Sequence, residues 1–224
     1  MPELILGIDD AGRGPVIGPM ILAGCLIKAE AEKELKRLGV RDSKQLSKTR
    51  RAFLETAIKE KAEAFFVVKT QASEIDGKNK DGINLNDLEA HMAAQIINEI
   101  NKGSGKMKVV IDCPSTNRTS WTETVKTYID NLSNLEISCE HKADVNHVAV
   151  SAASILAKEE REREMDILKG KYGPAIGSGY ASDPKTKKFL KKNLKKLDDH
   201  GIFRKSWSTW KKAHSDSNQK KLFS

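Results

Sequence analysis

The stretch from Leu4 to Pro19, LILGIDDAGRGPVIGP, decides the fold. Apolar and partly β-branched residues run as far as Ile8, which is typical of a strand covered on both faces. Asp9 and Asp10 follow directly, and a Gly-Arg-Gly turn comes after them. Because side chains alternate between the two faces of a strand, both carboxyl groups can approach one ion only if the strand ends at these two acids, and the glycines that follow allow that ending. The stretch therefore predicts two acids at the rim of a buried sheet.

Length and composition describe a globular chain with one main core. The 224 residues allow a core with an appended subdomain, and 38% of them are hydrophobic while 31% are charged. No apolar run approaches the roughly 20 residues of a membrane span. The N-terminus lacks the basic region and cleavage site of a signal peptide, so we expect no membrane contact and a cytoplasmic location.

The charge and the cysteines narrow the choice of partner. A net charge of +8 favours a polyanionic partner. The cysteines are Cys25, Cys113 and Cys139; they are odd in number and form no CxxC pair, so neither a disulfide framework nor a zinc site is indicated.

Strand and helix patterns alternate along the chain, which predicts an α/β fold. Strands are predicted at 16–28, with a break at Gly18-Pro19 as the alternative, and at 64–69, 108–112 and 135–139. Helices are predicted at 29–38, 47–62, 84–100, 119–132, 146–169 and 184–197. Residues 76–82, rich in charge and glycine, are predicted to form a loop.

Four aspartates fall at strand ends or at a helix start: Asp9, Asp10, Asp112 and Asp144. Carboxylates gathered at one point repel each other, and a divalent cation is their natural neutraliser. A ligand set of oxygen atoms without His or Cys suits Mg²⁺ or Mn²⁺. Such clusters typically hold two ions about 3.5 to 4 Å apart. The alternative interpretation is a set of separate surface or capping aspartates, with Asp144 as a helix N-cap.

Seven segments together resemble archaeal-type ribonuclease HII, the type 2 enzyme that cuts RNA in RNA/DNA hybrids. They are IDDAGRGPVIGPM, VRDSKQL, VVID, HKAD, VSAASILAK, GSGYASDPKT and RKSW, and they run in order from Ile8 to Trp207. The resemblance implies a ribonuclease H-like mixed sheet flanked by helices, in a catalytic domain at residues 1–172. A small helical substrate-binding region at 173–218 and a tail at 219–224 would follow.

The resemblance makes Asp9, Asp10, Asp112 and Asp144 the catalytic, metal-binding acids. One departure stands out, because the family's second acid is Glu and position 10 here is Asp. The side chain is shorter by one carbon–carbon bond, about 1.5 Å. We expect this change to affect catalytic rate and metal preference more than the class of reaction.

Two elements are expected to read the ribose. Glycines let main-chain groups approach a ligand closely, and a 2′-hydroxyl both donates and accepts hydrogen bonds. The resemblance accordingly assigns the turn Gly12, Arg13 and Gly14 to ribose contacts, and Tyr180 to the junction between RNA and DNA. From the residues alone, a tight turn with a solvated Arg13 and a structural tyrosine remain open.

Basic residues supply candidate phosphate contacts. Arg41, Ser43 and Lys44 precede a helix start, where cations, a hydroxyl and amides suit a phosphate. A capped, solvated loop is the alternative. Lys142 stands two residues before Asp144 and is expected to steady the scissile phosphate. The charged second half of the long helix, with Lys158 and Arg161, is more typical of a solvated face. Seven lysines between positions 185 and 196 favour backbone attraction that weakens with salt.

The last residues resemble the start of a sliding-clamp-binding motif. Gln219 and Leu222 fit its spacing, whereas Phe223 stands where paired aromatics are expected. We therefore predict at most a weak clamp contact from this tail.

Together these observations predict a monomeric, metal-dependent endonuclease that hydrolyses the RNA strand of RNA/DNA hybrids. It would also nick 5′ of single ribonucleotides in duplex DNA, as in ribonucleotide excision repair, and leave 5′-phosphate and 3′-hydroxyl ends. One alternative is an acid-cluster DNA endonuclease of integrase or resolvase type. Another is a hybrid-binding protein whose Asp10 has disabled metal chemistry.

Overall fold

The computed structural model describes residues 4–41, 43–103 and 105–222, with residues 218–222 described in backbone only. The chain forms two compact units. The first comprises Met1–Ala11, Ile21–Val68 and Leu85–Glu160, and the second Gly12–Met20, Lys69–Asn84 and Arg161–Ser224. The division into 1–172, 173–218 and 219–224 stays a prediction.

A five-stranded mixed sheet in the order β3-β2-β1-β4-β5 forms the centre of the first unit, which confirms the predicted fold class. β1 pairs antiparallel with β2 and parallel with β4, and β4 pairs parallel with β5. The strands are β1 (Leu4–Ala11), β2 (Met20–Lys28), β3 (Ala64–Thr70), β4 (Met107–Asp112) and β5 (Leu135–Glu140).

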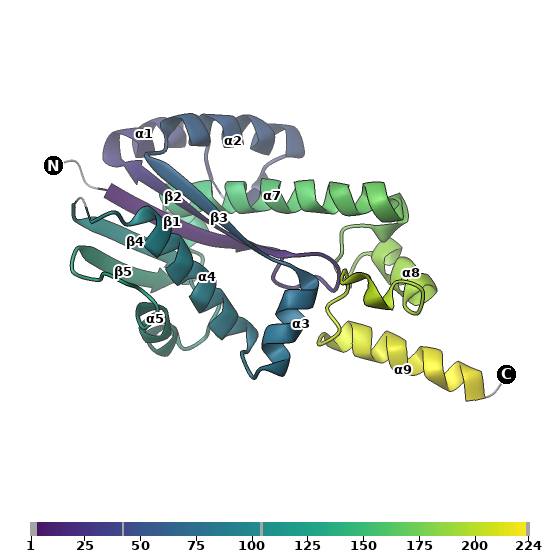
Figure 1. Cartoon of the computed structure of the whole chain (residues 1–224). Helices are drawn as coiled ribbons and strands as arrows, with labels where there is room; N and C mark the ends of the chain where they lie inside the picture. The colour runs from purple at the N-terminus through teal and green to yellow at the C-terminus, as the bar shows by residue number, and fades with distance from the viewer. Residues whose placement is uncertain (1–3, 42, 104, 223–224) are drawn as a thin grey trace. The chain divides into compact units, whose positions relative to one another are not determined.

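Helices cover both faces of this sheet (Figure 1). The helices of the first unit are α1 (Ala29–Arg37), α2 (Lys48–Lys61), α4 (Leu85–Ile100), α5 (Arg118–Lys126), α6 (Ala143–Asn146) and the larger part of α7 (Val148–Tyr172). A 3-10 turn, η1 (Ser43–Gln45), precedes α2. Ser47, the first residue of the predicted helix, caps α2, since its side chain accepts a hydrogen bond from the Arg50 amide.

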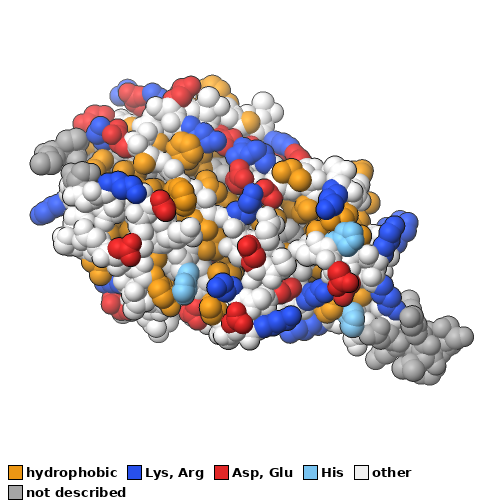
Figure 2. Space-filling view, in the orientation of Figure 1, with side chains coloured by type: hydrophobic (Ala, Val, Ile, Leu, Met, Phe, Trp, Pro, Cys, Tyr) orange, Lys and Arg blue, Asp and Glu red, His pale blue; other side chains and the backbone are white. Residues whose placement is uncertain are grey.

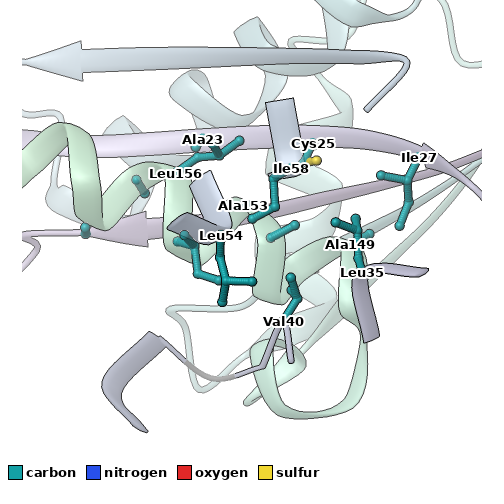
Figure 3. Close-up of a cluster of buried hydrophobic side chains, with 14 of the residues drawn as sticks. Ala23, Cys25, Ile27, Leu35, Val40, Leu54, Ile58, Ala149, Ala153 and Leu156 are labelled. Carbon is teal, nitrogen blue, oxygen red and sulfur yellow. The ribbon is translucent and has the colours of Figure 1, made fainter. Parts of the chain in front are cut away.

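The main core lies between β2 and the helices α1, α2 and α7. Figure 3 shows Ala23, Cys25 and Ile27 of β2 facing Leu54 of α2 and Ala153 of α7. All of these side chains are buried. The opposite face of β2 packs on α4, because a Cβ at Gly24 would lie 2.3 Å from Ile96. Small residues at the start of α7 allow a close approach to the sheet, since a Cβ at Gly7 would lie 2.1 Å from the Ala149 backbone.

Some elements differ from the sequence predictions. β1 does not end at Asp9 and Asp10: it continues to Ala11, because β2 stays paired with it to the register Ala11–Ile21. The parallel ladder with β4 does stop at Ile8, paired with Ile111, so one edge of β1 is open beyond that residue. The helix predicted from 146 begins at Val148 as α7, and the short helix α6, which ends at Asn146, was not predicted.

The predicted loop at 76–82 is wrong, because residues 72–80 form the helix α3 (Ala72–Lys80). Gln71 and Glu74 form a capping box at its start, and this local bonding outweighs the low helix propensity of Gly77. The helix predicted at 119–132 ends at Lys126.

The second unit has its own hydrophobic core. Ile17 pairs with Phe203 in an isolated antiparallel bridge, and Phe189 and Leu190 of α8 pack into the same cluster. Besides α3 and the end of α7, the unit contains η2 (Pro174–Ile176), α8 (Pro184–Asn193), η3 (Asp198–His200) and α9 (Ser208–Leu222). Across the described part of the chain, none of the helices combines the length and apolar character needed to cross a membrane.

Candidate active site

Asp9 and Asp10 lie on the part of β1 that β4 no longer covers. Asp9 points to the α7 face of the sheet, where the Ser154 hydroxyl hydrogen-bonds to its carboxyl group. The Asp10 amide also donates to Asp9 Oδ1 at 2.7 Å. Because side chains alternate along a strand, the Asp10 side chain starts from the opposite face. Asp9 is only 6% exposed, whereas Asp10 is half-buried.

Asp112 and Asp144 complete the acidic edge of this unit. Asp112 is the last residue of β4, and its Oδ1 accepts a hydrogen bond of 2.8 Å from the Ala143 amide. Asp144 lies in the first turn of α6 and is buried. It is not the N-cap considered from the sequence, since Lys142 occupies that position. Ser151 anchors this turn by donating its hydroxyl to the Asp144 backbone carbonyl at 2.5 Å.

The pKa shifts show that these carboxyl groups act on one another. Burial raises the pKa of Asp9 well above 3.8, and the charges of Asp10 and Asp112 raise it further. Burial also raises the pKa of Asp112; the Ala143 amide opposes this, and the charge of Asp144 adds to it. The four acids therefore form a row of neighbouring like charges, which a cation would stabilise.

A fifth acid beside this row has a hydrogen-bond partner of its own. Glu140, at the end of β5, pairs with Asp112 in the sheet register, and its Oε2 lies 2.8 Å from His147 Nε2. The hydrogen bond with His147 lowers the pKa of Glu140. The sequence did not single out this pair, although both residues flank the HKAD segment.

The donor set of the row fits a divalent cation, because carboxylate oxygens are ligands that Mg²⁺ and Mn²⁺ prefer. Among the described residues, however, no three acidic, histidine or cysteine side chains are grouped tightly enough to ligate one ion. Joint ligation of one ion would therefore require side-chain rotations, for which the half-buried Asp10 and Asp112 have more room than the buried Asp9.

The predicted phosphate contacts of the first unit differ in exposure. Lys44 is 85% exposed, and its Nζ lies 3.9 Å from Asp144 Oδ2. Arg41 and Lys142 are exposed, whereas Ser43 is buried and bonds to Ser154. Lys142 has a left-handed backbone conformation, with φ 58°, at the start of α6. The structure thus brings Lys44 to the acidic edge and turns Ser43 inward.

The Gly12-Arg13-Gly14 turn belongs to the second unit, where Arg204 holds it. The fully buried guanidinium of Arg204 donates to the carbonyl oxygens of Gly12 at 2.6 Å, Arg13 at 2.8 Å and Gly18 at 3.0 Å. Asp76 of α3 fixes the segment after Arg204 by accepting from the amides of residues 205 and 206. The turn is therefore built by residues far away in the sequence.

Tyr180 lies in the same unit as the turn. A Cβ at Gly14 would stand 3.9 Å from Tyr180 Cε1, so the ring adjoins the turn. The Arg161 guanidinium lies 5.7 Å from the centre of the Tyr180 ring and donates to the Pro19 carbonyl at 2.7 Å. Arg161 is 2% exposed, so the prediction of a solvated helix face is wrong at this position. Buried backbone carbonyls need a donor, and Arg161 supplies it.

Comparison with known proteins matches nearly the whole chain to one family. A model described as Ribonuclease HII matches residues 6–210. Ribonuclease HII of Methanocaldococcus jannaschii is 42% identical over 233 residues, which cover 98% of this chain and 98% of that protein.

Solved structures of ribonuclease H2 and ribonuclease HII also match this chain. The ribonuclease H2 of Pyrococcus horikoshii OT3 matches with a TM-score of 0.85 at 33% identity, covering 96% of this chain and 99% of that one. A structure of the PCNA:RNase HII complex from Archaeoglobus fulgidus matches with a TM-score of 0.80 at 34% identity, covering 92% of this chain and 95% of that one.

A mixed sheet flanked by helices, with carboxylates at the ends of its central strands, defines a metal-dependent endoribonuclease of the ribonuclease H-like class. Such an enzyme cleaves the RNA of an RNA/DNA hybrid internally. The chain belongs to the ribonuclease HII family.

Proposed function

We propose that the protein nicks duplex DNA 5′ of single embedded ribonucleotides, in addition to cleaving longer hybrids, and that Asp9, Asp10, Asp112 and Asp144 hold its metal ions. The observation that carries the proposal is the row of interacting carboxyl groups at the open edge of β1 and β4. A role in ribonucleotide excision repair, in the cytoplasm and as a monomer, fits this activity.

The four acids would hold Mg²⁺ or Mn²⁺. When bound, two such ions supply positive charge that activates the attacking water and stabilises the leaving 3′-oxygen, which gives 5′-phosphate and 3′-hydroxyl ends. Asp9, fixed by β1 and by the Ser154 hydroxyl, provides a rigid ligand. Lys44 and Lys142, both exposed beside the acidic segments, orient the scissile phosphate by charge.

Recognition of the ribose is assigned to the second unit. The main-chain groups of Gly12, Arg13 and Gly14 read the 2′-hydroxyl, and Tyr180 stacks at the junction with DNA. The hydrogen bonds of Arg204 support this role, because a turn that reads a hydroxyl group must keep one fixed shape. Arg41, exposed before η1, contacts the phosphate backbone of the duplex.

The basic side chains of α8 supply a sequence-independent attraction. Lys187, Lys188, Lys191 and Lys192 line one open groove with Pro184. On the face drawn in Figure 2, basic side chains are otherwise interspersed with acidic ones. The α8 lysines are thus a local concentration of positive charge suited to phosphates.

A clamp contact is proposed for the C-terminus through Gln219, Leu222 and Phe223. The relative from Archaeoglobus fulgidus was solved as a complex with PCNA, which supports the idea. The side chains of Gln219 and Leu222, and the whole of Phe223, lie outside the described residues.

Cleavage of three matched duplexes tests the proposal. With Mg²⁺ or Mn²⁺, we expect a nick 5′ of one ribonucleotide in DNA, cleavage of a full hybrid, and no cleavage of the all-DNA duplex. Cleavage of the all-DNA duplex would favour an integrase or resolvase type of endonuclease. Hybrid binding without turnover, restored by Asp10→Glu, would indicate a metal-impaired protein. Asp112→Asn should abolish cleavage while leaving hybrid binding intact.

A further inference from the structure

A buried pair of serines adjoins Asp9 in the first unit. Ser43 of η1 and Ser154 of α7 are 111 residues apart in the sequence, and their hydroxyl oxygens lie 2.9 Å apart. Ser43 is 6% exposed and Ser154 5% exposed. The Ser154 hydroxyl also hydrogen-bonds to the Asp9 carboxyl group. Three polar groups from η1, α7 and β1 therefore form one continuous chain.

In the ionised form that ligates a cation, the Asp9 carboxylate fixes the direction of this chain. It only accepts hydrogen bonds, so Ser154 donates its single hydroxyl proton to it. The hydroxyl of Ser154 then has only lone pairs left for Ser43, and Ser43 must be the donor of their shared bond. Each hydrogen bond in such a chain polarises the next one, so the bond from Ser43 strengthens the hydrogen bond from Ser154 to Asp9.

We propose that Ser43 and Ser154 are positioning residues of the reaction, which hold the Asp9 carboxylate in the orientation needed to ligate a divalent cation. The inference rests on the proposed function, in which Asp9 is a metal ligand. It gives Ser43 a different task from the phosphate contact that the family resemblance implies.

The surroundings of Ser43 favour the positioning role. A hydroxyl that binds a substrate phosphate has to be accessible, whereas Ser43 is buried and its hydroxyl shares a hydrogen bond with Ser154. Its neighbour Lys44 is 85% exposed and lies beside Asp144. Adjacent residues of η1 thus face opposite ways, with Lys44 turned toward solvent and Ser43 toward the support of Asp9.

Loss of either hydroxyl should leave the Asp9 carboxyl group in place but less firmly oriented. Groups that orient a metal ligand typically contribute 10-fold to 100-fold to metal affinity or activity. We expect Ser154→Ala to weaken Mn²⁺ binding and to lower kcat by about 10-fold. Ser43→Ala should act in the same direction, and the double variant should be no worse than Ser154→Ala, because Ser43 acts only through Ser154.

The experiment uses the full chain and makes three measurements. Mn²⁺ affinity without substrate is measured by electron paramagnetic resonance, hybrid affinity in EDTA by fluorescence anisotropy, and hybrid cleavage by kcat and KM. The proposal predicts weaker Mn²⁺ binding and lower kcat, with hybrid affinity unchanged. Ser43→Thr, which keeps the hydroxyl, should keep the wild-type Mn²⁺ affinity. If the alanine variant does not fold, Ser43→Cys, which has a weaker donor, provides the test.

Ile27→Val is the control. Ile27 is a fully buried core residue of β2 that pairs with Ile5, four residues before Asp9 on β1, and the substitution trims one methylene group. This variant should lower thermal stability while leaving Mn²⁺ affinity at the wild-type value.

Weaker hybrid binding in Ser43→Ala, with unchanged Mn²⁺ affinity, would overturn the proposal and restore Ser43 as a phosphate contact. Additive losses in the double variant would overturn it as well. Failure of the proposed function is recognised separately, because the wild type itself would then neither bind Mn²⁺ nor cleave a hybrid.

Discussion

Arg204→Lys is expected to destabilise the second unit although it preserves the positive charge. The guanidinium makes three hydrogen bonds to the carbonyls of Gly12, Arg13 and Gly18 and is fully buried. A compact ammonium lacks the planar fork and keeps about one of these bonds. Two buried carbonyls then lose their donor at about 1–3 kcal/mol each, so we expect a loss of about 3 kcal/mol. For a chain of this length that corresponds to a melting midpoint lower by about 6–12 °C.

Thermal unfolding followed by circular dichroism, and kcat/KM on a duplex with one ribonucleotide, provide the assay. Activity should fall at temperatures where the variant is still folded, since the 12–14 turn loses its fixed shape. Arg37→Lys, at an exposed position of α1, is the control and should stay within about 0.5 kcal/mol of wild type. If Arg204→Lys melts like this control and keeps full activity, the argument from the buried guanidinium is refuted.

Asp9→Asn should raise the melting midpoint in EDTA at pH 7, because it removes a carboxyl group whose ionisation is unfavourable in the folded protein. The gain in unfolding free energy is about 1.4 kcal/mol for each unit by which folding raises the pKa of Asp9. The raised pKa destabilises the folded protein only at pH values above the pKa of the unfolded chain. The difference in melting midpoint between the variant and the wild type should therefore vanish as the pH falls toward 3.8, and equal midpoints at every pH would contradict this prediction. Lys142→Gly should stabilise the protein by about 0.5–1 kcal/mol in urea unfolding, since glycine accepts φ 58° without strain, whereas Lys142→Ala should give no gain. Replacing Lys187 and Lys191 of α8 by Gln should make hybrid binding less sensitive to salt. The slope of log K against log salt concentration should become shallower by about 0.9 for each phosphate contact that is lost. An unchanged slope would show that the α8 groove does not bind the hybrid.

Local patterns predicted most of the first unit because its helices and strands satisfy local rules. The period of apolar residues identified α4, and Ser47 marked the start of α2. The helix α3 was missed because Gly77 and its charged neighbours resemble a loop. Its capping box, Gln71 with Glu74, was the signal that would have found it.

The supports of the site could not be read from local sequence. Ser43 and Ser154 meet across 111 residues, and no local pattern pairs one with the other. The small residues around Ser154 indicate close packing on the sheet, but they do not show that its hydroxyl supports Asp9. Arg161 lies in a run of charges typical of a solvated face, and only its carbonyl partners explain its burial. Long-range hydrogen bonds therefore decide which of several similar polar residues hold the site.

The open edge of β1 has a consequence for position 10. Successive residues of a strand leave the backbone in opposite directions, so the two acids start from different sides of the sheet. Asp9 is already anchored, and the second carboxyl group has to come round the uncovered edge to meet it. The distance that this carboxyl group can reach depends on the number of methylene groups in the side chain, and aspartate has one fewer than the glutamate of the family pattern. The side chain at position 10 is about 1.5 Å shorter here than a glutamate, and its length therefore determines how closely the second carboxyl group can approach Asp9.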